Sequence, residues 1–376
     1  MKLLVVSHSS NLGGAEVCFG QALRYFTGRT GIEIAAAYPD GVLAMDWERL
    51  CPRIPYQGSL PATFRPKGYL GWLVRGSSGR GSLKLELRSG GYDAVVLFSS
   101  VLTAPLRAAH ECSVPSIVFV RERIAPAWVR GMLWRSIARS ARRVVAVSES
   151  VAAEFAASTG RQAAVIHDGV EIPPPRAPFE TAIDGLCVSF YGGYDRNKGG
   201  DVFVRAVARL AADHPQARFR YYGVARGPAV SGRFRRDVRS LANELGVATR
   251  IEFAETAAFA PTYAEAAVVV IASRNEALPL VALEAMAWGV PVVATAVGGL
   301  PGLLRSLDAR LLAPSQNAQA LADAIGRVLD DGGLRASVGR RARRLVEAEY
   351  SLDASMAELE SVISDAASRG DGACMR

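Results

Sequence analysis

Long apolar runs, paired cysteines and clustered histidines are all missing from this sequence of 376 residues. Residues 266–272 form one of its longest apolar runs, far short of the roughly 20 residues that a membrane-spanning helix needs. The five cysteines contain no CxxC pair and the four histidines show no metal-ligand spacing, so neither a disulfide framework nor a zinc site is indicated. The apolar start at residues 1–6 is too short for a signal peptide. We therefore expect a soluble, cytoplasmic protein.

Disorder is excluded by composition, because 50% of the residues are hydrophobic and only 21% are charged. The net charge of +8 is unevenly distributed. Residues 1–180 hold 21 Lys and Arg against 14 Asp and Glu, a net +7, while the remainder holds 23 against 22. A basic first half is compatible with nucleic acid, anionic lipid or a phosphorylated substrate as partner, and charge alone does not choose among them.

Both halves begin with an apolar strand pattern, a glycine pair and a helical pattern. Further β-branched runs without strict alternation follow in each half, at 94–98, 116–120, 144–147, 219–222, 268–271 and 292–295. Such runs predict parallel sheets covered on both faces by helices, and residues 317–367 read as helical. The fold class is therefore α/β, with a proline-rich linker at 171–178 between two Rossmann-like domains.

We predict a first domain over residues 1–172 and a second over 173–350. Residues 351–376 are expected to form a helix that crosses back to the first domain, followed by a frayed tail. Open parallel sheets bind ligands beyond the carboxyl ends of their strands. The loops that follow the strands are therefore expected to carry the chemistry.

The most specific stretch is SRNEALPLVALEAMAWGVP, at residues 273–291. Pro279 suits the first turn of a helix, whose N-terminus would offer backbone N–H groups to an anionic or hydroxyl-rich ligand. Glu276 lies in the entering loop and Glu284 within the helix, so each could accept hydrogen bonds from a different diol. The alternative is that Glu276 only stabilises the helix N-terminus and that Glu284 is a solvated surface residue.

A second candidate site is GGYDRNKGG, at residues 192–200. Its order of Lys and Gly is not that of a P-loop. The glycines would let the backbone approach a ligand, and Lys198 would neutralise a diphosphate leaving group. The alternative is an ordinary glycine-rich turn with a surface lysine. No GxGxxG follows either domain's first strand, which argues against a dinucleotide-dependent oxidoreductase.

These motifs resemble those of retaining glycosyltransferase family 4, whose GT-B fold consists of two Rossmann-like domains facing across a cleft. The family signature of two glutamates with seven residues between them, ending in LEAMA-x-G-x-P-V-V-A, matches residues 276–294. Similar motifs stand at 9–16, 166–170 and 297–301, so the resemblance covers nearly the whole chain. It implies a nucleotide-diphosphate sugar bound to the second domain, a hydroxyl acceptor on the first, and no metal or other cofactor.

The resemblance also implies roles for individual residues. Glu276 would lie beside the donor sugar, Glu284 would hold the ribose hydroxyls, and Lys198 would grip the diphosphate. The implied donor-binding residues are Gly13, Gly14, Gly192, Gly193, Arg196, Lys198, Ala277, Leu278, Pro279, Leu280 and Glu284. Where the family usually has Glu-Gly-Phe-Gly this chain has EALP, so the identity of the donor sugar stays open.

Two departures from the family pattern concern charged residues. Gly193 stands at a position where the family usually has arginine, and we hypothesise that Arg196 substitutes for it. Arg121 and Glu122 follow the strand at 116–120, where many relatives carry a histidine. Arg121 would bind an acceptor phosphate or the donor diphosphate and Glu122 would orient the acceptor hydroxyl, unless the two form only a salt bridge at the sheet edge. Together with Glu276 and Lys198 they are the candidate catalytic residues.

Residues 121–143 interleave seven arginines with Trp128 and Trp134. They could lie on an anionic membrane surface at the inner face of the membrane, or form an ordinary helix that buries Leu133, Trp134 and Ile137. A phosphorylated or lipid-linked acceptor would suit the basic first half better than nucleic acid, which we do not expect as a partner.

The resemblance thus implies a metal-independent retaining glycosyltransferase of bacterial-type polysaccharide, glycolipid or glycosylated-metabolite biosynthesis. Two alternatives remain open: a nucleotide-sugar 2-epimerase and a non-catalytic sugar-nucleotide-binding protein.

Overall fold

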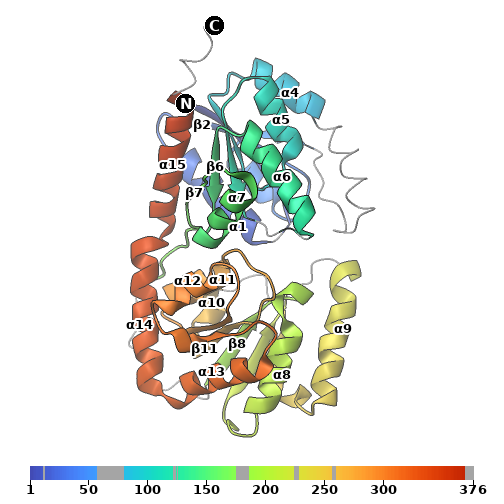
Figure 1. Cartoon of the computed structure of the whole chain (residues 1–376), viewed down its shortest axis with the longest axis vertical. Coiled ribbons are helices and arrows are strands. Elements are labelled where there is room, and N and C mark those ends of the chain that lie inside the picture. Colours follow the sequence, from blue (N-terminus) through green and yellow to red (C-terminus); the bar gives the residue numbers. More distant parts are fainter. Residues whose placement is uncertain are drawn as a thin grey trace. The chain divides into compact units, whose positions relative to one another are not determined.

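The computed structural model describes residues 1–11, 13–56, 80–121, 124, 126–174, 186–223, 228–255 and 260–368. The chain divides into two compact units (Figure 1). Unit 1 consists of Met1–Asp168 and Asp353–Arg376, and unit 2 of Gly169–Leu352. These boundaries lie within four residues of 172 and 350, where the sequence places them.

Unit 1 contains, among its described residues, a seven-stranded parallel sheet in the order β3-β2-β1-β4-β5-β6-β7. The strands are β1 (Lys2–Val6), β2 (Glu33–Tyr38), β3 (Arg53–Pro55), β4 (Ala94–Leu97), β5 (Ser116–Val120), β6 (Arg143–Ala146) and β7 (Ala164–Val165). The central strands β4 and β5 are buried along their whole length, as their unalternating apolar sequences predict.

The helices of unit 1 lie on both sides of this sheet (Figure 1). They are α1 (Gly14–Thr27), α2 (Ala44–Glu48), α4 (Arg80–Ser89), α5 (Thr103–Glu111), α6 (Ala127–Ser140), α7 (Glu149–Thr159) and α15 (Leu352–Ser368). Helix α6 buries Leu133, Trp134 and Ile137, so the interpretation of this stretch as an ordinary helix is confirmed as to its buried face. Trp128 on the same helix is 63% exposed.

Helix α15 packs in unit 1 through polar contacts with three of its segments. Tyr25 on α1 donates a hydrogen bond to Glu360 (3.0 Å), and Ser355 donates to the carbonyl of His167 (2.7 Å). Arg143 on β6 forms an ion pair with Asp365. The last helix of the chain therefore completes the first unit.

Unit 2 contains a six-stranded parallel sheet in the order β10-β9-β8-β11-β12-β13, again among the described residues. The strands are β8 (Cys187–Tyr191), β9 (Arg218–Tyr222), β10 (Ile251–Ala254), β11 (Val268–Ile271), β12 (Val292–Thr295) and β13 (Leu312–Ala313). The helices are α8 (Gly200–Leu210), α9 (Pro228–Glu244), α10 (Ala260–Tyr263), α11 (Leu280–Ala287), α12 (Leu300–Arg305), α13 (Ala318–Asp330) and α14 (Gly332–Glu349). Short 3-10 turns are η1 (Arg196–Lys198), η2 (Ala248–Arg250) and η3 (Ala309–Leu311).

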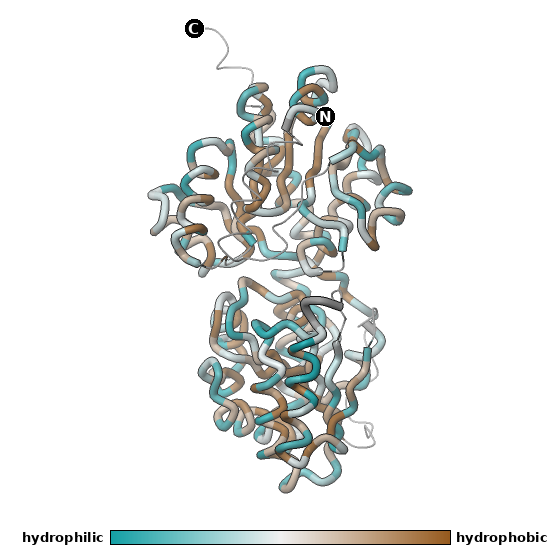
Figure 2. Tube along the Cα trace, turned by 90° about the vertical axis from the view of Figure 1, so that its right-hand side faces the viewer, coloured by the Kyte–Doolittle hydropathy of each residue, from teal (hydrophilic) through white to brown (hydrophobic). Residues whose placement is uncertain are grey.

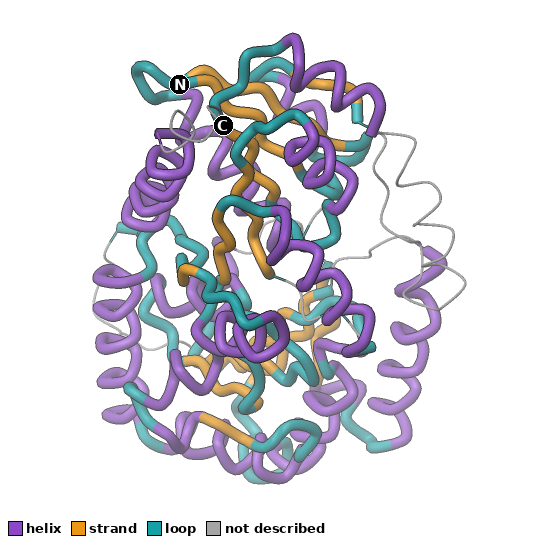
Figure 3. Tube along the Cα trace, turned by 45° about the horizontal axis from the view of Figure 1, so that its top comes forward, coloured by secondary structure: helices purple, strands orange, loops and turns teal. Residues whose placement is uncertain are grey.

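Hydrophobic segments run through the middle of unit 1, with hydrophilic residues on the segments around them (Figure 2), and Figure 3 shows strands in the middle with helices around them. Among the strands, β4 and β11 are wholly apolar, whereas β9 carries two arginines. The prediction of an α/β chain with two Rossmann-like parallel-sheet domains is confirmed. No helix among the described residues is long and apolar enough to cross a membrane.

Each sheet has a topological switch point, where the chain leaves two neighbouring strands towards opposite edges of the sheet. In unit 1 it lies between β1 and β4, and in unit 2 between β8 and β11. In doubly wound folds the crevice beyond the carboxyl ends of such strands is the usual ligand site.

Gly199 brings two loops together at the switch point of unit 2. Its φ of +74° lies in the left-handed region, and a Cβ at this position would lie 1.9 Å from the carbonyl oxygen of Ala272. The loop after β8 therefore contacts the loop after β11 through backbone atoms.

Replacing Gly199 by alanine should destabilise unit 2, because the new methyl group overlaps a backbone oxygen and the left-handed φ becomes strained. We expect a loss of more than about 2 kcal/mol in the free energy of unfolding, measured by urea titration. Gly302→Ala in α12 is the control, since a Cβ there meets no atom within 4 Å. It should be neutral or stabilising by up to about 1 kcal/mol. Equal stabilities of the two variants would contradict the close approach.

Candidate active site

Lys198 and Glu276 meet at the switch point of unit 2, although 78 positions separate them in sequence. The Lys198 Nζ donates a hydrogen bond to Glu276 Oε2 over 2.7 Å. The hydroxyl of Ser273 donates to the same oxygen over 3.0 Å. The Lys198 side chain is 32% exposed and that of Glu276 is 13% exposed. The structure thus brings together the two residues that carry the two separate sequence motifs.

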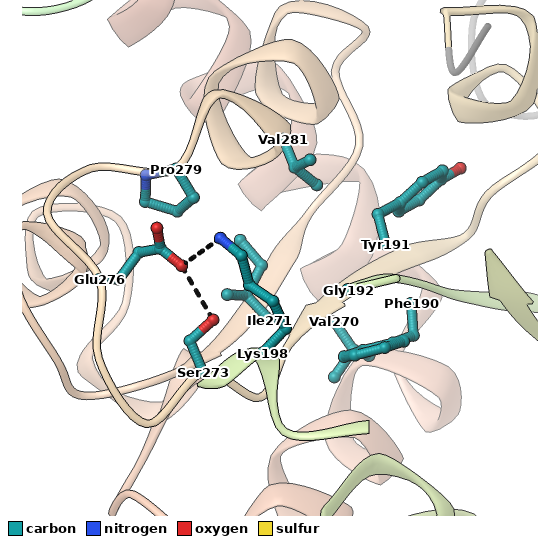
Figure 4. A pocket seen from close by; sticks show the side chains of 10 residues that line it. All are labelled: Phe190, Tyr191, Gly192, Lys198, Val270, Ile271, Ser273, Glu276, Pro279 and Val281. Carbon is teal, nitrogen blue, oxygen red and sulfur yellow. Dashed lines mark hydrogen bonds and ion pairs between the residues drawn. The ribbon is translucent and has the colours of Figure 1, made fainter. Parts of the chain in front are cut away.

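These polar groups line one side of a pocket whose other walls are largely apolar (Figure 4). Pro279 and Val281 come from the start of α11, Phe190 and Tyr191 from β8, and Val270 and Ile271 from β11. A mostly apolar wall with a few convergent polar groups is typical of a small-molecule site. The ammonium and the carboxylate allow it to bind a ligand that combines anionic oxygens with hydroxyl groups.

A third loop, residues 297–301 after β12, packs against the backbone of the Glu276 loop. Gly298 has a φ of +57°, and a Cβ there would lie 1.8 Å from the carbonyl oxygen of Glu276. The Gly299 amide donates to the carbonyl of Ala277 over 2.6 Å. The VGGLP motif at 297–301 therefore positions the Glu276 loop through its backbone.

Helix α11 begins directly after Pro279, the residue that the sequence places in its first turn. Pro279 occupies the N-cap position with an extended conformation, and Leu280 is the first helical residue. No side chain caps this end of the helix. Leu278 and Leu280 are buried, and Pro279 lines the pocket, whereas Ala277 is not among the lining residues.

Glu284, one turn into α11, is bonded to a tyrosine of α10. The Tyr263 hydroxyl donates to Glu284 Oε2 over 2.6 Å, and the Tyr263 side chain is buried. Burial raises the pKa of the Glu284 carboxyl above its ordinary value, and the hydrogen bond from Tyr263 offsets part of that rise. Glu284 is therefore no freely solvated surface residue.

The glycine pair after β8 forms a tight turn whose conformation excludes a larger residue. A Cβ on Gly192 would lie 2.0 Å from the ring of Phe190, and Gly193 has a φ of +57°. The Tyr221 hydroxyl donates to the Gly193 carbonyl over 2.7 Å. An arginine at position 193 would be strained here, which gives a physical reason for the departure from the family pattern. Arg196, in η1, has an exposed side chain.

The candidate residues of the first half lie in unit 1. Gly13 is the N-cap of α1 in extended backbone and Gly14 is its first residue. Arg121 follows β5, is 8% exposed, and forms a buried ion pair with Asp168. Its guanidinium also lies 4.4 Å from the centroid of the Phe119 ring. Arg121 thus has a carboxylate partner other than Glu122, which lies outside the described residues.

Sequence reasoning left out several residues that shape the site. Ser273 lies inside the quoted motif but was given no role, although it is the second residue after strand β11. Tyr263 gave no signal, because its contact with Glu284 arises only when α10 packs on α11. Among the described residues, no group of three or more His, Cys, Asp and Glu side chains is placed to hold a metal ion.

A family of known proteins matches part of the chain. Residues 186–331 match the family model described as Glycosyl transferases group 1. These residues include both Lys198 and Glu276. The resemblance to a family 4-like glycosyltransferase, stated from the motifs, is confirmed.

Two individual relatives are similar to about half of this chain. The D-inositol 3-phosphate glycosyltransferase of Corynebacterium aurimucosum is 37% identical over 184 residues, which are 48% of this chain and 43% of that protein. Its counterpart in Acidothermus cellulolyticus is 40% identical over 166 residues, 43% of this chain and 37% of the relative. The matches thus span less than half of these relatives' own length.

Solved structures show the fold over nearly the whole chain. Anabaena HepE in complex with UDP-glucose has a TM-score of 0.79 at 21% identity, covering 97% of this chain and 100% of HepE. Sucrose-phosphate synthase from Thermosynechococcus elongatus has a TM-score of 0.80 at 22% identity, covering 97% of this chain and 98% of the synthase chain. The GT-B fold class is confirmed.

Removing the Tyr263 hydroxyl should make stability depend more strongly on pH. Because burial holds the Glu284 pKa above its ordinary value of 4.5, the folded state disfavours the ionised form. Stability from this group is therefore greatest at low pH and falls as pH rises through the folded pKa. Tyr263→Phe removes the offsetting hydrogen bond. The loss in the free energy of unfolding should therefore be small at pH 4 and increase with pH, reaching about 1–3 kcal/mol at pH 8.

Urea unfolding between pH 4 and pH 8 measures this difference. Combining Tyr263→Phe with Glu284→Gln is the control, since no ionisable group then remains at position 284. The added pH dependence should disappear in the double variant. If Tyr263→Phe costs the same at every pH, the hydroxyl does not influence the ionisation of Glu284.

Proposed function

We propose that the chain is a retaining glycosyltransferase that moves a sugar from a nucleotide-diphosphate donor to an acceptor hydroxyl without a metal ion. The observation that carries the proposal is the Lys198–Glu276 pair at the switch point of unit 2, within the residues that match the glycosyltransferase family. Fold alone would not carry it, because one fold serves many reactions.

Lys198 takes the diphosphate in this proposal. An ammonium group has three N–H donors, so Lys198 can keep its bond to Glu276 and still donate to a phosphate oxygen. Its positive charge stabilises the negative charge that develops on the leaving diphosphate. The N-terminal end of α11, which has no side-chain cap, adds backbone dipoles of the same sign.

The two glutamates take the hydroxyl groups of the donor. Glu276 has one oxygen bonded to Lys198 and Ser273, and its other oxygen accepts hydroxyls of the sugar. Glu284 has one oxygen bonded to Tyr263, and its other oxygen accepts the ribose hydroxyls. A uridine nucleotide is the first donor to test, because HepE, a structural neighbour, is bound to UDP-glucose.

The acceptor is proposed to be a phosphorylated polyol. The curated relatives are named for inositol 3-phosphate, and the excess of positive charge lies in the first half of the chain. Arg121, and Glu122 beside it, are proposed to serve the acceptor. Retention would follow if the acceptor hydroxyl attacks the face from which the diphosphate leaves, with the diphosphate taking the proton. A cytoplasmic location, with contact to the inner face of a membrane, belongs to the same proposal.

A nucleotide screen by thermal unfolding tests the donor. Any ligand that binds only the folded protein raises the melting temperature with occupancy. UDP and UDP-glucose should raise it by several degrees, and Lys198→Ala should abolish most of the shift, because charge-assisted bonds to a diphosphate contribute about 1.5–3 kcal/mol each. Arg205→Ala, which removes an exposed cation from α8, is the control and should keep the shift. A flat response to uridine, guanosine and adenosine donors alike would remove the basis of the proposal.

Product analysis tests the reaction. With UDP-glucose and an inositol phosphate, UDP release should depend on the acceptor, and the new linkage should keep the donor's anomeric configuration by NMR. Glu276→Gln should lower kcat about a hundredfold or more, while the exposed Glu349→Gln should leave it unchanged. Epimerised sugar nucleotide formed without acceptor would instead establish the epimerase alternative. Donor binding without turnover across acceptors would establish a non-catalytic binding protein.

A further inference from the structure

Arg274 links three segments around the candidate site. Its guanidinium forms two parallel hydrogen bonds with Asp201 on α8, from Nη1 to Oδ1 (2.9 Å) and from Nη2 to Oδ2 (2.6 Å). The Nη1 atom also donates to the carbonyl of Arg196 over 2.6 Å, and Nε donates to Gln316 over 3.3 Å. The backbone N–H of Arg274 donates to the carbonyl of Asn197 over 2.7 Å.

Two of these contacts fall on the turn that carries Lys198. Residues 196 and 197, whose carbonyls accept from Arg274, are the first two residues of η1, and Lys198 is the third. The turn's own bonds are local: the Asp195 side chain accepts from the Asn197 amide (2.9 Å), and the Lys198 amide donates to the Asp195 carbonyl (3.0 Å). An isolated 3-10 turn is weakly stabilised by such bonds. A long-range anchor therefore decides where the turn lies.

The same residue is tied to the Glu276 side of the pocket by the chain itself. Arg274 follows Ser273, whose hydroxyl donates to Glu276. Holding η1 at Arg274 thus fixes the distance between the Lys198 turn and the Glu276 loop. The planar, forked guanidinium makes two parallel hydrogen bonds to Asp201 and a further one to the carbonyl of Arg196. A lysine ammonium does not provide this fixed two-bond geometry.

The charge of Arg274 is already balanced. The Asp201 pKa is lowered from its ordinary value: burial opposes this, but the hydrogen bonds and charge of Arg274 outweigh it. The side chains of the pair are 19% and 27% exposed. Arg274 is absent from the residues that line the pocket. Its guanidinium is therefore suited to holding the turn rather than to binding an anion.

We propose that Arg274 is a positioning residue: through Asp201 and η1 it holds Lys198 against Glu276, and so sets the affinity for the diphosphate of the donor without contacting it. The diphosphate part of this inference rests on the proposed function. The placement of Lys198 does not, and it can be tested without any nucleotide.

Lysine labelling followed by mass spectrometry tests the placement. Lys84 is a matched internal reference, because it donates to Glu111 over 2.9 Å and its side chain is 32% exposed, as that of Lys198 is. In Arg274→Ala, the ratio of Lys198 to Lys84 acylation should rise about threefold, since a partly exposed ion pair gives modest protection. Arg274→Lys should behave like the alanine variant. Arg310→Ala, which removes an exposed arginine paired with Asp308, should leave the ratio unchanged.

Calorimetry with UDP and uridine tests the consequence for the diphosphate. Arg274→Ala should weaken UDP about tenfold and uridine less than twofold. The double variant with Lys198→Ala should bind UDP no more weakly than Lys198→Ala alone, because Arg274 acts only through Lys198. Additive losses would mean that Arg274 touches the diphosphate itself, and equal losses for UDP and uridine would mean general disruption. Either result overturns the inference.

The two failures are distinguishable. If the wild-type protein binds neither UDP nor UDP-glucose, the proposed uridine donor is wrong, while the labelling ratio still decides the role of Arg274. If UDP binds but the ratio and the affinity are unchanged in Arg274→Ala, the positioning role is wrong and the donor assignment stands.

Discussion

Three loops at the carboxyl ends of β8, β11 and β12 pack backbone against backbone, and the rest of the candidate site depends on this packing. Gly199 approaches the carbonyl of Ala272, and Gly298 approaches that of Glu276, at distances that leave no room for a side chain. With nothing between the loops, a lysine from one and a glutamate from another can meet within 2.7 Å. The glycines therefore act on the chemistry indirectly, by bringing charged residues within reach of each other.

The polar groups of the site have partners before a ligand arrives. Lys198 is bonded to Glu276, and Glu284 to Tyr263. A buried polar group without a partner costs free energy, so this pairing keeps the site stable while it is free. A ligand would then add hydrogen bonds to groups that already have partners, and no charged group of these pairs would be unpaired in the free site. The orientation of each carboxylate is also set in advance, which lowers the entropy that binding must overcome.

Much of this arrangement was predictable from the sequence. The apolar strand patterns identify β4, β5, β11 and β12, and the two glycine-containing motifs identify Lys198 and Glu276. A parallel-sheet topology then predicts that loops after neighbouring strands converge. The missing parts depend on tertiary packing. Tyr263 and Glu284 lie on different helices, and Arg274 and Asp201 are 73 positions apart in sequence. Neither contact therefore has a local sequence pattern. The Arg121–Asp168 pair likewise joins residues 47 positions apart.

The position of α15 has a consequence for synthesis on the ribosome. Unit 2 is formed by one continuous stretch, whereas unit 1 needs both the start of the chain and its last helix. Translation delivers residues in order, so unit 2 has its complete sequence before unit 1 does. Until α15 emerges, the carbonyl of His167 and the side chains of Tyr25 and Arg143 lack the partners that this helix supplies. Synthesis of unit 1 therefore begins before that of unit 2, but unit 1 can complete its folding only after the residues of unit 2 have been made.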